Sequence, residues 1–301
     1  MRCHESAVAI GLALALVTPR ASAQACCAGA AVATPGRLGP HDFVLVGADV
    51  RAAAVVGSYG DDGKFTPRAP GTVEDDLEQD VFAAIRVLRR GQLALFVPFI
   101  ETLRRAGTLT DVGGGLGDVN VSARWDFYYA GQSRVLPGVA MLAGVTFPTG
   151  IPIESAGDPL GANATGVGAF QFNGGLALEQ TFGPWLVALS GIIAARTSRT
   201  VGAISETLAP QISALATLAY TTRAEIAFAL SSAVTYEGDA TINGADAAST
   251  ERLTLTISTG ASIPLGDTWR AQVGASVVGP FVGENTLTSV GLQWTLVHTW
   301  F

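Results

Sequence analysis

Histidine and cysteine are scarce in this 301-residue chain, with three of each. Nucleophilic catalysis needs a serine or cysteine, a histidine base and an orienting acid within mutual reach. After the first 23 residues the histidines are His41 and His298. The strand pattern described below places both at one rim, far from where a lipid-hydrolysing site is needed. We therefore expect no catalytic residues, no metal site and no cofactor, and a lipid-active enzyme is the least favoured alternative.

The charged residues exclude further classes of protein. The chain has 18 basic and 25 acidic residues, a formal net charge of -7 and a single lysine, Lys64, so no cationic surface is available to bind nucleic acid. Only 14% of residues are charged, against about 25% in ordinary soluble domains. Beyond the N-terminus no apolar run reaches the roughly 18 residues that a spanning helix needs.

The N-terminus has the features of an export signal. Arg2 precedes an apolar stretch from Ala7 to Val17, and Ala21-Ser22-Ala23 supplies a cleavage site. We expect residues 1–23 to be a signal peptide and residues 24–40 a flexible periplasmic segment. Cys26 and Cys27 remain after cleavage, and two fates stay open for them: oxidation in an exported compartment, or lipidation of Cys26 after an alternative cut.

From residue 41 onward, apolar and polar residues alternate. Between Asp118 and Tyr128, Val119, Val121 and Trp125 share one face, and polar residues share the other. This period of two indicates a strand with one apolar and one polar face. Twelve such segments lie near residues 42–58, 79–88, 93–103, 118–128, 135–147, 169–181, 185–197, 206–220, 224–237, 252–263, 269–278 and 287–301.

The connections between these segments alternate between short and long. Arg89 to Gln92 and Phe182 to Pro184 are short, whereas Tyr59 to Glu78 and Pro148 to Gly168 are long. This rhythm is typical of outer-membrane barrels, which have tight periplasmic turns and extended external loops. An open sheet edge is not tolerated in hydrocarbon. We predict an all-β, antiparallel transmembrane barrel of about 12 strands over residues 41–301, with a soluble sandwich as the structural alternative.

Two glycine-containing motifs carry a family resemblance. Gly115-Leu116-Gly117-Asp118 opens one predicted strand, and Phe147-Pro148-Thr149-Gly150 follows one hairpin later. In this pattern the chain resembles the outer-membrane family named for the meta-pathway of phenol degradation, although Ile151 stands where an acidic residue is expected. The resemblance implies a barrel that passes small, often aromatic, organic compounds. Pro148, Thr149 and Gly150 are candidates for a gate loop, although the favoured explanation is that they simply end the strand.

Strand parity identifies the side chains that should face the barrel interior. Both signs of charge are present, so we expect these side chains mainly to neutralise one another and brace the wall. A charge-selective route for solutes is the remaining alternative. The predicted pore-lining charged residues are Asp49, Arg51, Arg86, Arg124, Asp126, Glu179, Glu225, Glu237, Arg252 and Arg270.

The sequence therefore predicts a porin-like channel or transporter in the outer membrane of a Gram-negative cell. Its solutes would be small, hydrophobic or aromatic organic compounds, and its other partners outer-membrane lipids. About twelve strands leave room for a narrow pore. A structural or adhesive barrel with partner-binding external loops is the main alternative. We expect a monomer.

Overall fold

The computed structural model describes residues 36–201 and 204–301. The predicted signal peptide, Cys26, Cys27 and residues 24–35 lie outside the described residues. No helix in the described part of the chain is long and apolar enough to cross a membrane.

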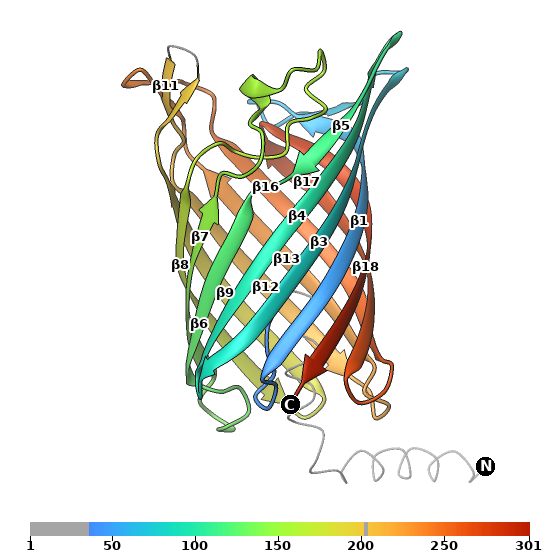
Figure 1. Ribbon diagram of the computed structural model, residues 1–301, viewed down its shortest axis with the longest axis vertical. Helices are drawn as coiled ribbons and strands as arrows, with labels where there is room; N and C mark the ends of the chain where they lie inside the picture. The colour runs from blue at the N-terminus through green and yellow to red at the C-terminus, as the bar shows by residue number, and fades with distance from the viewer. Residues whose placement is uncertain (1–35, 202–203) are drawn as a thin grey trace, which may run out of the picture.

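Twelve antiparallel strands form a closed barrel, as the alternation predicted (Figure 1). The barrel closes because β18 pairs with β1 along nearly its whole length, for example Asp49 opposite Thr295. The wall consists of β1 (Val44–Tyr59), β3 (Thr72–Leu88), β4 (Gly91–Ala106), β6 (Val119–Tyr128), β7 (Gly138–Phe147), β8 (Gln171–Phe182), β9 (Trp185–Arg196), β12 (Gln211–Thr221), β13 (Ala227–Glu237), β16 (Arg252–Pro264), β17 (Trp269–Glu284) and β18 (Thr286–Trp300).

Each strand presents its apolar residues outward and its small or polar residues inward. In β12, Leu218 is 44% exposed on the outer face, whereas its neighbour Thr217 is 4% exposed. Thr217 shares a hydrogen bond with Ser231 of β13 in the interior. An apolar outer band around a polar interior is the arrangement that hydrocarbon imposes on a barrel.

The two ends of the barrel differ. At the tight-turn end, strands are joined by short segments such as Arg89–Arg90 and Gly183–Pro184. At the long-loop end, the connections are extended, except that β17 and β18 are joined by Asn285 alone. Asn285 has a φ of 44°, a left-handed conformation that asparagine tolerates in turns. The first strand starts and the last strand ends at the tight-turn end (Figure 1).

Several strands extend beyond the expected bounds at the long-loop end. β3 begins at Thr72, whereas the alternation indicated a start near residue 79. Short strands also occur among the long connections. β2 (Phe65–Pro67) pairs with β1, β5 (Leu109–Leu116) pairs with β4, and a separate four-stranded sheet joins β10 (Arg199–Val201), β11 (Ile204–Thr207), β14 (Thr241–Ile242) and β15 (Ala245–Asp246).

Aromatic side chains surround the tight-turn end. Trp125, Trp185, Trp269 and Trp300 are all partly exposed on the outer face near that end, and Trp185 contacts Tyr220 with ring centroids 4.9 Å apart. Rings with a polar edge favour the boundary between headgroups and hydrocarbon. These rings form an aromatic girdle at the tight-turn end of the barrel.

Candidate functional site: the barrel interior

The barrel encloses a chamber with a volume of about 440 Å³. This volume lies within the range of small-molecule binding sites. The inner faces of β4, β6, β7, β8, β9 and β12 form its wall, and Gly36 and Arg37 reach it from the N-terminal side.

The chamber wall combines uncharged hydrogen-bonding groups with aliphatic ones. Amides and hydroxyls come from Asn120, Ser122, Gln171, Asn173, Ser190, Gln211, Ser213 and Thr217. Apolar surface comes from Leu142, Ile192, Leu215 and several alanines. Such a wall can accept a neutral solute that has both a polar group and an apolar part.

Four charged side chains form an ionic cluster at one end of the chamber. Arg124 Nη2 lies 2.9 Å from Asp126 Oδ1 and 3.1 Å from Glu179 Oε1, and Arg37 forms a further ion pair with Glu179. All four side chains are nearly buried. Two arginines and two carboxylates neutralise one another, so the cluster braces the wall and presents no single sign of charge.

The N-terminal strap, residues 36–42, enters the barrel at the tight-turn end. Leu38 is 5% exposed and packs with Leu45, Phe82 and Val297. Its backbone N–H donates to Gln92 Oε1 at 3.1 Å, and Gln92 Nε2 donates to the carbonyl of Gly36 at 3.5 Å. The strap therefore occupies part of the interior, a position that the sequence pattern did not indicate.

Arg86 and Arg270, two of the predicted pore-lining residues, lie at the tight-turn end. Arg86 donates to the backbone carbonyls of Gly39 and Asp42 and thereby holds the strap. Arg270 Nη2 lies 3.7 Å from Glu225 Oε2. Glu225 lies in the turn before β13. Its φ is 62°, a positive value that few non-glycine residues adopt.

Of the remaining predicted residues, Glu237 and Arg252 lie at the long-loop end of their strands. Arg51 lies in the middle of β1, and Asp49 lies nearer its tight-turn end. Glu237 forms an ion pair with Arg196, whose Nε also donates to Gln171 Oε1 at 2.9 Å. Arg252 faces Glu237 across the β13–β16 pair and is exposed. Arg51 donates through Nε to Glu78 Oε2 at 2.9 Å, and Asp49 is described below.

The two sequence motifs bind one another. The Asp118 carboxylate accepts hydrogen bonds from the backbone N–H of Gly150 at 2.9 Å and of Val167 at 2.7 Å. Thr149 Oγ1 donates to the carbonyl of Gly117 at 2.6 Å and accepts from the N–H of Val119 at 3.0 Å. These contacts anchor the connection between β7 and β8 to the start of β6.

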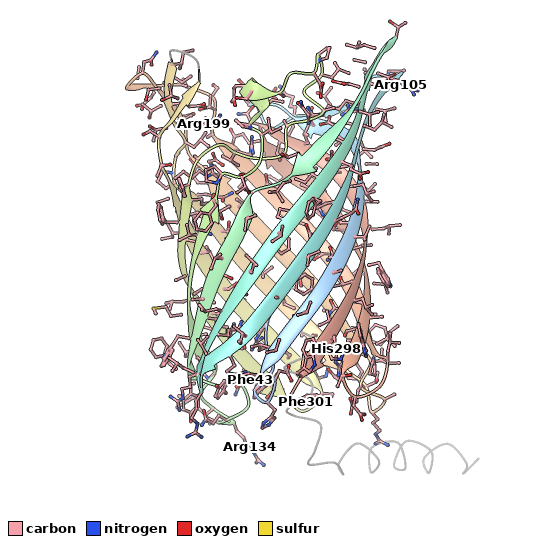
Figure 2. All side chains as sticks on the ribbon, viewed as in Figure 1. Phe43, Arg105, Arg134, Arg199, His298 and Phe301 are labelled. Carbon is pink, nitrogen blue, oxygen red and sulfur yellow. The ribbon has the colours of Figure 1, made fainter. Side chains whose placement is uncertain are left out.

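Arg199 joins this connection to the small external sheet. Its guanidinium lies 2.6 Å from Glu154 Oε1, donates to Glu206 Oε2 at 2.9 Å and bonds the carbonyl of Val167. Figure 2 shows Arg199 at the long-loop end, away from His298 at the opposite end. Arg199 thus connects the segment between β7 and β8 to the small external sheet.

His41 and His298 lie in different surroundings. His298 packs edge-to-face between Trp269 and Trp300, with ring centroids 4.5 and 4.0 Å away, whereas His41 is exposed in the strap. Within residues 36–201 and 204–301, no three His, Cys, Asp or Glu side chains are grouped so that they could hold a metal ion.

Several interior charges were missed by the sequence-based selection. Glu74, Asp76, Glu78 and Asp80 occupy alternate positions of β3 and share the inner face with Phe82. The first three fell outside the predicted strand. The regular spacing of these acids was the signal that could have identified them.

Comparison with known proteins identifies the fold. No family model matches the chain, and no curated protein matches it. Among solved structures, an outer-membrane channel from Pseudomonas putida F1 is similar with a TM-score of 0.72 and 13% identity, over 95% of this chain and 100% of that one. The NanC porin is similar with a TM-score of 0.50 and 8% identity, over 84% and 100%. The chain has the fold of outer-membrane β-barrels.

Proposed function

We propose that this protein is an outer-membrane channel that passes small organic solutes with an apolar part, aromatic compounds among them. The lumenal chamber is the observation that supports this proposal most directly, because it offers both apolar and neutral polar surface in a small volume. The likeness of the Gly115–Asp118 and Phe147–Gly150 motifs to the phenol meta-pathway family favours aromatic solutes. Association with outer-membrane lipids and a monomeric state belong to the same proposal.

The charges beside the chamber support a preference for uncharged solutes. The ionic cluster at one end of the chamber has no net charge. At the other end, Arg196 and Glu237 form an ion pair that also has no net charge. A solute ion entering the chamber would lose hydration without meeting an opposite charge that is free. A neutral solute with one hydroxyl or carbonyl group can use the amides of the wall.

Liposome swelling tests the proposal. The folded protein is reconstituted, and swelling is followed in isosmotic phenyl glucoside, methyl glucoside and sucrose, with protein-free liposomes as the baseline. We expect the fastest swelling in phenyl glucoside and the slowest in sucrose. Rates equal to the baseline for all three solutes would refute a channel.

A chamber-filling variant links any flux to this site. Ser213→Trp places an indole in the chamber, whereas Ala214→Trp places it on the outer face of the same strand. We expect flux to fall in the first variant and to persist in the second. Equal flux in both would show that solutes do not pass through the chamber.

A further inference from the structure

Two buried carboxylates lie opposite one another in the barrel wall. Asp49 of β1 and Asp80 of β3 are direct cross-strand partners, and they are 4% and 5% exposed. Both belong to the inner face, since Asp49 bonds the lumenal side chains of Gln293 and Thr295 across the β1–β18 seam. Directly opposite residues of an antiparallel pair have Cβ atoms about 4.5–5.5 Å apart.

The neighbouring charges do not neutralise this pair. Arg51, the nearest arginine along β1, is engaged by Glu78. Further up β3, Glu74 forms ion pairs with Arg68 and Arg104. The carboxylates of Asp49 and Asp80 have no ion pair of their own among the described residues, which leaves an excess of negative charge on this side of the lumen.

Asp80 also has an unsatisfied acceptor. Its Oδ1 is fully buried and has no hydrogen-bond partner in the described structure. Asp49, by contrast, accepts from Gln293 Nε2 at 3.0 Å and from Thr295 Oγ1. A buried acceptor without a partner is rare in folded proteins and points to an ion or water that completes it. Like charges directly opposite one another add a second cost.

We propose that the Asp49–Asp80 pair binds a compact cation in the lumen wall. A positive charge between the two strands would remove the repulsion and satisfy Asp80 Oδ1 at once. The donors are carboxylate oxygens, with the side chains of Gln293 and Thr295 beside them. Oxygen donors suit a hard metal ion or the ammonium group of a primary amine. The pair supplies two carboxylates, and the adjacent Glu78 is engaged by Arg51, so the site would keep part of the cation's hydration.

Calorimetric titration of the folded protein in a non-ionic detergent tests this site. The titrants are calcium chloride and methylammonium chloride, with choline chloride, a cation too bulky for the pair, as the ionic-strength control. We expect saturable one-to-one binding of at least one compact cation and none of choline. The stronger of the two identifies whether a metal ion or an ammonium group is preferred.

Isosteric neutral variants assign the binding to the pair. Asp80→Asn and Asp49→Asn should each weaken binding at least tenfold, whereas Asp75→Asn, which removes an exposed carboxylate of the same strand, should leave it unchanged. Migration as the folded species on unheated gels verifies that each variant folds. Absence of saturable binding in the wild type, including the case in which the pair holds a proton instead, overturns the proposal. Unchanged binding in Asp80→Asn does so as well.

Discussion

Leu189 and Ser190 are adjacent residues of β9 that face opposite sides of the wall. Leu189 is 50% exposed on the outer surface, and Ser190 lines the chamber. We expect Leu189→Arg to lower the free energy of unfolding in lipid by about 2–4 kcal/mol, because a charge near the bilayer midplane is poorly solvated. Urea titration of the reconstituted barrel, followed by tryptophan fluorescence, measures this change.

Ser190→Arg is the matched control for that substitution. An arginine at this position extends into the polar interior, so its cost should be clearly smaller, while it narrows the chamber and reduces solute flux. A similar loss of stability at both positions would contradict the assignment of the two faces.

At the scale of elements, the strap depends on one buried side chain. Leu38→Asp would place a charge against Phe82 and Val297, at a cost of several kcal/mol, whereas each hydrogen bond that holds the strap contributes about 1–3 kcal/mol. We expect the strap to leave the interior and single-channel conductance to rise. His41→Asp, an exposed position of the same strap, should leave conductance unchanged.

The connection between β7 and β8 depends on the carboxylate of Asp118. Asp118→Asn replaces one acceptor by an N–H group that opposes the backbone donors of Gly150 or Val167. We expect a local loss of about 1.5–3 kcal/mol, seen as faster hydrogen exchange of these two amides. Solute flux measured in parallel tests whether Pro148, Thr149 and Gly150 act as a gate.

Asp158→Asn serves as the control for the loop variant, because it removes a charge from the same connection without touching the motif contacts. Exchange rates that do not change in Asp118→Asn would show that the two motifs are held by other contacts, such as the bond from Thr165 Oγ1 to the carbonyl of Leu116.

The strands in the apolar band could be predicted because hydrocarbon requires every second residue to be apolar. That requirement ends where the strands extend past the apolar band at the long-loop end. Between Thr72 and Glu78 the outer positions include Asp75, so the alternation is lost although the strand continues. The short strands of the external connections were missed for the same reason. The position of the strap could not be predicted, since burial of Leu38 depends on Phe82 and Val297, which are distant in sequence.

The interior charges were only partly predictable. The alternation of inward and outward residues was enough to assign Arg124, Asp126 and Glu179 to the inner face. In the structure Arg124 contacts both carboxylates. Their partner Arg37 belongs to a segment without periodicity. Asp80 lay inside a predicted strand, but its lack of a partner is a property of packing and cannot be read from spacing.

At the scale of the whole molecule, all five tryptophans are at least partly exposed on the outer face: Trp125, Trp185, Trp269, Trp294 and Trp300. We expect brominated lipids to quench their fluorescence strongly and aqueous iodide to quench it weakly. Bromines near the headgroups should be the most effective, because four of the rings lie at the tight-turn end. Trp294 lies six residues before Trp300 in β18 and therefore further from the tight-turn end. Trp294→Phe should selectively reduce quenching by bromines deep in the bilayer.

A barrel folded in detergent-free buffer with iodide-accessible tryptophans would argue for the soluble alternative. The outer surface makes that outcome unfavourable: large apolar side chains are exposed on every wall strand. Exposed apolar surface of this extent marks contact with lipid or with another protein.

The strap leads directly into β1, and β1 forms the seam with β18. Once that seam has formed, the interior can be reached only through the two mouths. Leu38 and its partners lie near the tight-turn mouth, so the strap can reach its place through that mouth even after the first and last strands have met. Sealing of the cylinder and filling of its interior can thus be separate steps of assembly, and a chain whose strap cannot enter should be sealed empty and conduct from the start.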